Sequence, residues 1–476
     1  MVEDLDRAIE AYIQGNWEQV VRDIDELVRI PSVENLSAAA PGAPYGPELE
    51  RALEAALAVA ERMGLETHNC DGYIGYADLP GDSPVQLGII GHADIVPEGA
   101  GWTVPAFEVT RKEGYLVGRG VLDDKGPLIV ALYAVGFWKK HLQAQGRRFP
   151  YTVRMLIGAN EETTMGDVAY YRRHFEDPAF LITPDADFPV GYGEAGICHS
   201  LLTSAPIRGG RIMALEGGVA VNAVPGEAHA RIAVAGTALP QADGIKAAVS
   251  DGVADVRAYG KAAHASAPHL GKNAVDRLVA YLLATDALSE DERAFLELVR
   301  KVTSCSDGSG VGLQCTDEHF GGLTAVGSVI ALHADGATGI DTRLTLAIDF
   351  RYPTSISCSE IERRMSDVAA SYGAEFSVTH NKDPYLMDPA SPAICALDEA
   401  YCHVTGEDAK PFAMKGGSYA REFPRAASFG PDKSWEPKPA WAGAYHAADE
   451  GISEELLKQT LAIYIHAIGN LMEVAL

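Results

Sequence analysis

The stretch VQLGIIGHADIVP, residues 85–97, joins a short apolar run to a motif that contains a histidine and an aspartate. An apolar run of this length, bounded by turn residues, is typical of a buried strand. The arrangement recurs twice, because YTVRMLIG (151–158) precedes ANEETTMGD and AFLITP (179–184) precedes DADFP. The segment LIVALYAVGFWKKHLQAQG (128–146) has the length of a helix, and Pro127 suits a first helical turn. Strands alternating with helices predict an α/β fold with a largely parallel sheet.

Charged motifs follow three of these strands directly. In a largely parallel sheet, ligands bind in the crevice beyond the carboxyl ends of the strands, so we expect the motifs to converge there. The segment GRGVLDDKGP (118–127) adds two adjacent aspartates. The convergent set is His92, Asp94, Asp123, Asp124, Glu161, Glu162, Asp185 and Asp187. So many carboxylates need a compensating cation. Imidazole and carboxylate ligands suit zinc, and also manganese or cobalt, and a shared carboxylate would give a two-metal site.

Composition and charge narrow the classes of protein further. A chain of 476 residues with 47% hydrophobic and 22% charged residues predicts two or three globular domains. Its net charge of −27 argues against a nucleic-acid partner. The acidic N-terminal segment does not resemble a signal peptide, and no apolar run reaches membrane-spanning length. The seven scattered cysteines contain no C-x-x-C pair, which predicts reduced thiols in a cytoplasmic protein.

Taken together, the motifs resemble a known family. GHADIVP, GRGVLDDKGP, NEE, PDADFP and the downstream series GGSYAR, FGP and YHAADE are similar to those of the co-catalytic di-zinc metallopeptidases, family M-twenty, and most of all to its PepV-type dipeptidases. The superfamily includes carnosinase, carboxypeptidase G and succinyl-diaminopimelate desuccinylase. The resemblance implies a mixed, largely parallel sheet flanked by helices, with an inserted α+β lid domain. The expected division is 1–190 and 385–476 for the catalytic domain and 191–384 for a lid of two α/β subdomains.

The resemblance also implies roles for the charged residues. The metal ligands would be His92, Asp123, Glu162, Asp185 and His446. Asp123 would bridge two divalent ions, zinc in the first place. Asp94 would orient His92, as a partner of a metal-bound imidazole commonly does, and Glu161 would be the general base. A cis peptide would join Asp123 to Asp124. Asn160 departs from the family, which often has aspartate there.

Further implied residues lie downstream. In the predicted lid, GGVAVNAVP offers Asn222, YGKAAHASAP offers His264 to stabilise an oxyanion, and DFRYP offers Arg351 to bind a substrate carboxylate. GGSYAR places Tyr419 and Arg421 near the substrate. Taken alone, His264 would more often be an ordinary loop histidine and Arg351 a surface cation on a strand, and the resemblance reverses both interpretations. The lid segments AHARIAVAG and RLTLAIDFRYP alternate like antiparallel strands, and the length of the lid favours a monomer.

The predicted function is therefore metal-dependent hydrolysis of unblocked dipeptides, with Xaa-His and β-alanyl dipeptides as candidate substrates. One alternative is an N-acyl amino acid deacylase or desuccinylase with the same di-metal chemistry. A second alternative is a non-enzymatic, metal-stabilised binding protein, which would have no use for a general base at Glu161. We expect no nucleic-acid or membrane partner.

Overall fold

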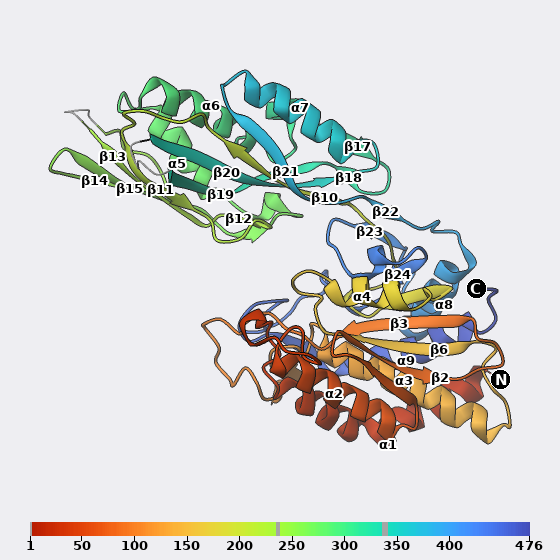
Figure 1. Cartoon of the computed structure of the whole chain (residues 1–476). Helices are drawn as coiled ribbons and strands as arrows, with labels where there is room; N and C mark the ends of the chain where they lie inside the picture. The colour runs from red at the N-terminus through yellow and green to blue at the C-terminus, as the bar shows by residue number, and fades with distance from the viewer. Residues whose placement is uncertain (1, 235–238, 336–340) are drawn as a thin grey trace. The chain divides into compact units, whose positions relative to one another are not determined.

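The structure is a computed structural model that describes residues 2–234, 239–335 and 341–476. The chain divides into two compact units (Figure 1). Unit 1 comprises Met1–Gly193, Leu386–Phe412 and Gly417–Leu476, and unit 2 comprises Glu194–Tyr385 and Ala413–Gly416. Unit 1 contains the three strand-and-motif segments from which the fold was predicted.

Unit 1 is built on a nine-stranded sheet of order β1-β2-β6-β3-β7-β24-β9-β22, with β23 paired to β9. The central strands β6, β3, β7 and β24 are parallel to one another, whereas β1 and β2 add antiparallel pairs at one edge. The sheet is therefore mixed and largely parallel, as predicted. Its strands are β1 (Glu66–Cys70), β2 (Ile74–Leu79), β3 (Gln86–His92), β6 (Thr152–Gly158), β7 (Phe180–Thr183), β9 (Gly191–Glu194), β22 (Tyr385–Leu386), β23 (Phe412–Met414) and β24 (Ala426–Ser428).

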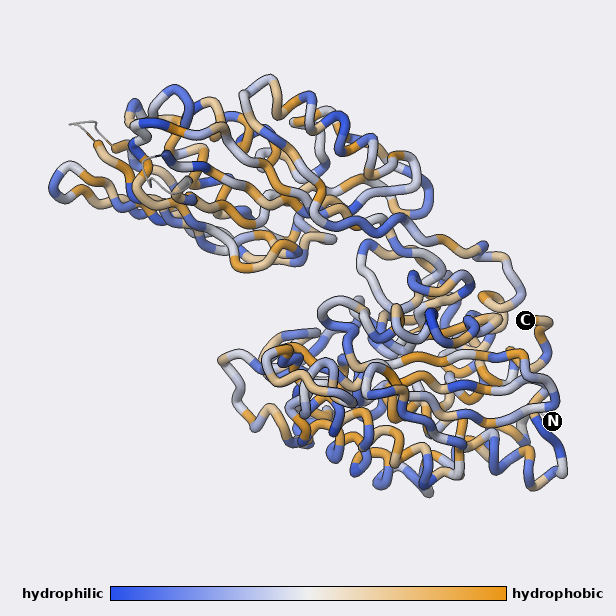
Figure 2. The backbone as a smooth tube through the Cα atoms, in the orientation of Figure 1, coloured by the Kyte–Doolittle hydropathy of each residue, from blue (hydrophilic) through white to orange (hydrophobic). Residues whose placement is uncertain are grey.

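Helices cover both faces of this sheet. Figure 1 shows α2 and α3 on one side of β3 and β6, and α4 on the other. The side chains of α3 are buried from Lys125 to Trp138, which explains an apolar run with no polar face. Hydrophobic and hydrophilic residues instead alternate along α1 and α2 (Figure 2). The helices are α1 (Val2–Val28), α2 (Pro47–Arg62), α3 (Lys125–Ala144), α4 (Gly166–His174), α8 (Pro392–Thr405) and α9 (Glu454–Leu471). Among the described residues, no helix is long and apolar enough to cross a membrane.

Two small sheets bring distant segments of unit 1 together. The first has the order β26-β5-β4 and consists of β4 (Thr110–Lys112), β5 (Tyr115–Val117) and β26 (Gly451–Ser453). The second pairs β8 (Ala186–Asp187) with β25 (Pro431–Asp432) in parallel. Because Gly451 pairs with Val117, the segment that follows His446 lies beside the segment that leads to Asp123.

Unit 2 has one eight-stranded antiparallel sheet of order β14-β15-β13-β11-β19-β20-β10-β21. Three helices, α5 (Ala274–Leu283), α6 (Glu290–Thr303) and α7 (Cys358–Ala370), share a continuous hydrophobic core with it, which gives the α+β architecture that was predicted. The strands are β10 (Gly196–Thr203), β11 (Ile212–Gly217), β13 (Glu227–Ala233), β14 (Ile245–Ser250), β15 (Val253–Tyr259), β19 (Thr324–Asp335), β20 (Asp341–Tyr352) and β21 (Glu375–Lys382). The end of the predicted strand AHARIAVAG, residues 235 and 236, lies outside the described residues.

Short elements complete the chain. Unit 2 also contains the two-residue strands β12 (Ala223–Val224), β16 (Ala263–His264), β17 (Thr316–Asp317) and β18 (Gly321–Gly322). Single turns of 3-10 helix occur at η1 (Leu36–Ala38), η2 (Pro268–Leu270), η3 (Ser309–Val311) and η4 (Tyr419–Glu422). Of these, the β12–β16 pair and η4 carry residues predicted to act in the site.

Candidate active site

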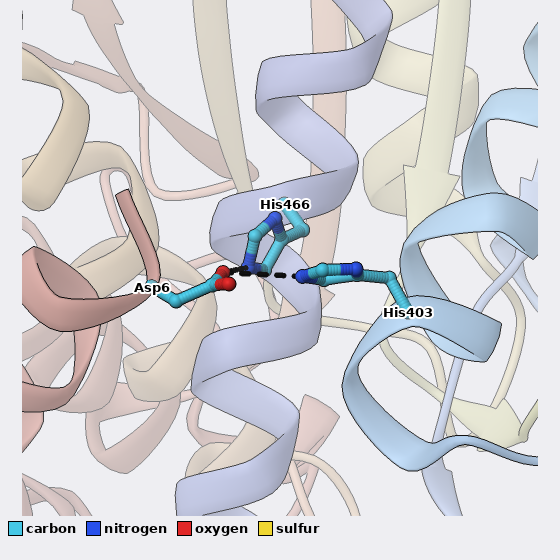
Figure 3. Close-up of side chains that lie close together, drawn as sticks. All are labelled: Asp6, His403 and His466. Carbon is cyan, nitrogen blue, oxygen red and sulfur yellow. Dashed lines mark hydrogen bonds and ion pairs between the residues drawn. The ribbon is translucent and has the colours of Figure 1, made fainter. Parts of the chain in front are cut away.

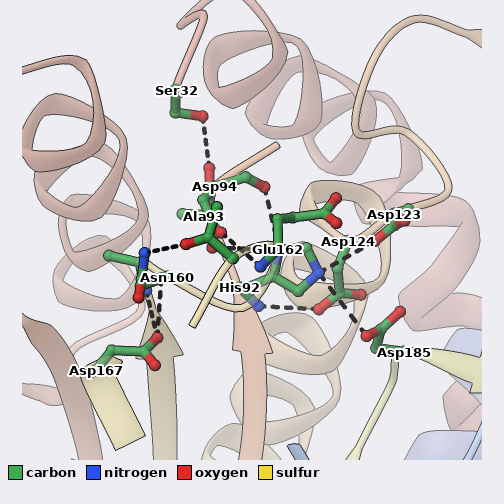
Figure 4. Close-up of polar contacts among 12 residues, drawn as sticks. Ser32, His92, Ala93, Asp94, Asp123, Asp124, Asn160, Glu162, Asp167 and Asp185 are labelled. Carbon is green, nitrogen blue, oxygen red and sulfur yellow. Dashed lines mark hydrogen bonds and ion pairs between the residues drawn. The ribbon is translucent and has the colours of Figure 1, made fainter. Parts of the chain in front are cut away.

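The parallel strands of unit 1 end at one edge of the sheet and place the charged motifs there. His92 is the last residue of β3 and pairs with Gly158 at the end of β6, so the Glu161–Glu162 segment starts beside it. Asp185 follows β7, the other neighbour of β3. Figure 4 shows the side chains of His92, Asp123, Glu162 and Asp185 gathered at this edge.

The gathered side chains form two groups that share one carboxylate. In the first, His92 Nε2 lies 3.1 Å from Asp123 Oδ1 and 3.8 Å from Asp185 Oδ2. In the second, His446 Nε2 lies 2.9 Å from Asp123 Oδ2 and 3.0 Å from Glu162 Oε2. Within each group the candidate ligand atoms lie within 4.8 Å of one another. The two oxygens of Asp123 thus face one group each, which is the arrangement of a carboxylate that bridges two cations.

The electrostatics of the two groups fit divalent cations. Desolvation, followed by the negative charge of Asp123, raises the pKa of Asp185 to about 7. Although desolvation opposes its charge, hydrogen bonds to Asp123 and Glu162 raise the pKa of His446 to about 11. The raised pKa values mean that Asp185 and His446 tend to retain protons when no metal ion is bound, as expected of a site that needs a cation. Glu162 Oε1 is also buried without a hydrogen-bond partner among the described residues. Imidazole with carboxylate oxygens is a ligand set that suits zinc.

Asp94 contacts one residue of each group, His92 and Glu162. The carbonyl oxygen of Asp94 lies 3.0 Å from His92 Nδ1, and its carboxylate Oδ1 lies 3.4 Å from the same atom. Its other carboxylate oxygen accepts a hydrogen bond of 3.0 Å from the backbone N–H of Glu162. The preceding carbonyl, that of Ala93, accepts a 2.6 Å hydrogen bond from the Ser32 hydroxyl. The orientation of the His92 ring therefore depends on the backbone at Asp94 as well as on its side chain.

The two adjacent aspartates have different environments. The peptide between Asp123 and Asp124 is cis. Asp123 faces the imidazoles, whereas Asp124 Oδ2 accepts a 3.0 Å hydrogen bond from the backbone N–H of His92. A Cβ atom at Gly91 would lie 2.6 Å from Asp124 Oδ2, so this close approach requires glycine. The Nζ of the neighbouring Lys125 donates instead to the carbonyls of Leu27 and Ile30.

The sequence interpretation missed the pair formed by Glu450 and Arg119. Glu450 Oε1 accepts from three backbone N–H groups of the aspartate turn, those of Gly120, Leu122 and Asp123, at 2.9, 3.0 and 3.2 Å. Its Oε2 accepts a 2.6 Å hydrogen bond from Arg119, and both side chains are almost fully buried. Arg119 also donates to the carbonyl of His446, a residue with a φ of 62°. Glu450 lies in the YHAADE motif, but nothing in that motif indicates which segment the glutamate binds.

Tyr419 and Asp167 support the Glu161–Glu162 segment. The hydroxyl of Tyr419, a fully buried residue of turn η4, donates to Asp167 Oδ2. The same oxygen accepts from the backbone N–H groups of Ala159 and Asn160 at 2.8 and 3.0 Å. The structure thus gives Tyr419 a contact with the support of the site, and its predicted contact with substrate stays a prediction. Arg421 lies half-buried in the same turn.

Three further predicted residues, Asn222, His264 and Arg351, belong to unit 2. Asn222 and His264 are exposed and lie side by side, because Ala223 of β12 pairs with His264 of β16. Arg351, on β20, is 4% exposed, so it is not a surface cation. Its Nε and Nη2 donate to the two oxygens of Asp349 at 2.8 and 2.9 Å. Asp187, which was grouped with the convergent acids, instead accepts a hydrogen bond from Ser434 in unit 1.

Comparison with known proteins gives a consistent result. Residues 88–470 match the family model described as "Peptidase family M20/M25/M40". The protein named "Putative dipeptidase YtjP" from Bacillus subtilis (strain 168) is 30% identical, over 95% of this chain and 97% of its own length. The "Beta-Ala-Xaa dipeptidase" of Lactobacillus delbrueckii subsp. lactis is 28% identical, over 96% of this chain and 97% of its own.

Solved structures share the fold at low identity. Human carnosine dipeptidase 1 matches with a TM-score of 0.61 and 13% identity, over 98% of this chain and all of that chain. Aminoacylhistidine dipeptidase from Vibrio alginolyticus matches with a TM-score of 0.58 and 13% identity, over 94% of this chain and 95% of that one. These similarities extend over both units of the chain.

Proposed function

We propose that this chain, which belongs to peptidase family M20/M25/M40 and is therefore a metal-dependent hydrolase of peptide bonds, cleaves unblocked dipeptides at a site for two divalent metal ions. The observation that carries the proposal is the shared carboxylate of Asp123, whose two oxygens face His92 and His446. The names of the relatives support a dipeptide substrate, and one of them, a Beta-Ala-Xaa dipeptidase, supports testing β-alanyl dipeptides.

The proposed ligands are His92, Asp123 and Asp185 for one ion, and Asp123, Glu162 and His446 for the other. When bound, the two ions, zinc first and manganese or cobalt as alternatives, would polarise the scissile carbonyl and lower the pKa of a water molecule. The chain's contribution is to fix the ligand atoms. Asp94 orients His92, and Glu450 holds the backbone of Asp123, so that both groups are preorganised.

Glu161 is the proposed general base. Desolvation, and next the negative charge of Asp185, raises the pKa of Glu161 well above its usual range. A carboxylate with a raised pKa is a better proton acceptor. One of its oxygens would take a proton from the attacking water and pass it to the nitrogen of the leaving residue. Asp94 has a separate task, because it holds the backbone of the next residue, Glu162.

We extend the proposal to unit 2 as the inserted lid domain, with boundaries near 191 and 384. His264 would stabilise the oxyanion and Asn222, its neighbour across the β12–β16 pair, would contact substrate. Arg351 would bind the substrate carboxylate in place of part of its present contacts, in which Nε and Nη2 donate to Asp349 and Nη1 donates to the carbonyl of Lys415. The length of this segment supports a monomer, and the free state of all seven cysteines supports a cytoplasmic location.

The experiment is turnover of zinc- or manganese-loaded protein on matched substrates: Ala-His and β-Ala-His, each with a free or an acetylated amino group. We expect hydrolysis of the free forms only, and loss of turnover in a Glu161→Gln variant that retains its metal. Hydrolysis of the acetylated forms alone would assign a deacylase with the same chemistry and contradict the dipeptidase proposal. No turnover of either series by the metal-loaded protein would support the binding-protein alternative.

A further inference from the structure

A third group of metal-ligand side chains lies in unit 1 on three helices that carry none of the proposed catalytic ligands. Asp6 is on α1, His403 on α8 and His466 on α9, and the three side chains point toward one another (Figure 3). Asp6 Oδ1 lies 3.1 Å from His403 Nε2 and 3.0 Å from His466 Nε2. All three candidate ligand atoms lie within 4.8 Å of one another.

The packing of the helices, rather than a local motif, creates this group. α9 packs against both α8 and α1, so residues near the two ends of the chain meet. The two imidazole rings have centroids 4.5 Å apart. Two imidazoles this close repel each other when both are protonated. Burial, and next the charge of His403, lowers the pKa of His466, which therefore favours the neutral form that binds a metal ion.

We propose that Asp6, His403 and His466 bind a third divalent transition-metal ion, of the zinc, cobalt or nickel class. Two imidazole nitrogens and one carboxylate oxygen form a ligand set that these ions accept. Bonds of 2.0–2.1 Å in tetrahedral geometry separate the ligand atoms by about 3.3–3.4 Å. The two Asp6-to-imidazole distances are within a few tenths of an ångström of that value, so small rotations of the side chains would admit an ion. The net charge of −27 favours a cation throughout.

The surroundings leave room for a further ligand. Asp6, His403 and His466 line a surface hollow of about 800 Å³, together with Ile9, Trp17 and Lys458. A water molecule from this hollow would complete a tetrahedral site. His466 is nearly buried, whereas the Asp6 and His403 side chains are each 42% exposed, so an ion can enter from solvent.

An ion at this position would fasten α1 to α8 and α9. Binding to the folded state alone raises stability in proportion to the logarithm of ligand concentration. The ion would act on the packing of the first helix and not on the chemistry, because its ligands and those of the proposed catalytic site share no residue. The alternative hypothesis is that Asp6 only accepts hydrogen bonds from two neutral imidazoles, and it predicts no third ion.

The zinc content of the protein distinguishes the proposed metal site from the hydrogen-bonded alternative. Metal-free protein is loaded with excess zinc, passed over a desalting column and analysed for zinc per chain, and crystals grown with zinc are examined for anomalous scattering. The variants are His403→Gln and Asp6→Asn, which retain polar side chains of similar size. His174→Gln, at an exposed histidine on α4 outside all three groups, is the matched control.

We expect three ions in the wild-type protein and in the control, and two in the His403 and Asp6 variants. We also expect zinc to raise the thermal midpoint less in these two variants than in the control. An anomalous peak between Asp6, His403 and His466 locates the third ion even if the catalytic pair binds none, which separates this proposal from the proposed function. Zinc absent from this position in the wild type, or retained there in His403→Gln, overturns the proposal. If His403→Gln fails to fold, the same zinc measurement on Asp6→Asn decides between the two hypotheses.

Discussion

Removing the carboxylate of Glu450 tests whether this buried residue holds the site together. Glu450 accepts from three backbone N–H groups and from Arg119, and neither charged side chain is more than 1% exposed. A buried donor without a partner costs about 1–3 kcal/mol. Glu450→Ala strands four such donors, so we expect it to lower the free energy of unfolding by at least about 4 kcal/mol. Glu450→Gln keeps an acceptor for the backbone but not the charged partner of Arg119, so we expect a loss of roughly 1.5–3 kcal/mol.

Urea unfolding of metal-free protein, followed by tryptophan fluorescence, measures the free energy of unfolding of unit 1, which contains Glu450. All five tryptophans, Trp17, Trp102, Trp138, Trp435 and Trp441, belong to unit 1. Glu455→Gln is the matched control, because the Glu455 side chain is 86% exposed and its replacement should change stability by less than about 0.5 kcal/mol. A Glu450→Ala protein within about 1 kcal/mol of wild type, or less destabilised than Glu450→Gln, would refute the reasoning.

Three further predictions concern other supports of the site. Asp94→Asn should weaken metal binding about 10- to 100-fold by calorimetry, because it disturbs the orientation of a ligand, and unchanged affinity would contradict that role. Tyr419→Phe should cost about 1–3 kcal/mol of unfolding free energy, because Asp167 loses a buried donor, and leave KM unchanged. A raised KM with unchanged stability would instead assign Tyr419 to substrate binding. Arg351→Lys should raise KM for dipeptides at least about tenfold without changing metal content, because lysine cannot reproduce the planar fork held by Asp349, and an unchanged KM would exclude carboxylate binding.

The fold of unit 1 could be predicted because its signals are local. The apolar runs 85–90, 151–158 and 179–184 correspond to β3, β6 and β7, and each charged motif starts where its strand ends. Parallel strands bring such ends to one edge. The antiparallel edge formed by β1 and β2 was not anticipated, because both strands are short and their hydrophobic pattern is weak.

Contacts between distant segments could not be predicted from local pattern. Glu450 binds a turn some 330 residues away, and Asp6 reaches a histidine 397 residues away. Each contact depends on how whole elements pack: β26 against β5 in the first case, and α9 against α1 and α8 in the second. A single glutamate or histidine in the sequence has no signal that distinguishes these positions from ordinary surface residues.

The sequence also cannot show which acids of the site are proposed ligands and which are supports. In the structure, hydrogen bonds from backbone N–H groups separate the two sets. Asp124, Asp167 and Glu450 each accept hydrogen bonds from backbone N–H groups. Asp123 and Glu162 instead face imidazoles, and a buried oxygen of Glu162 has no partner among the described residues. Backbone N–H groups thus hold the first three carboxylates in position as supports, whereas the oxygens of Asp123 and Glu162 point toward the imidazoles of the proposed metal site. Because Asp123 and Asp124 are neighbours in sequence, only the direction of each side chain relative to the backbone separates the two functions.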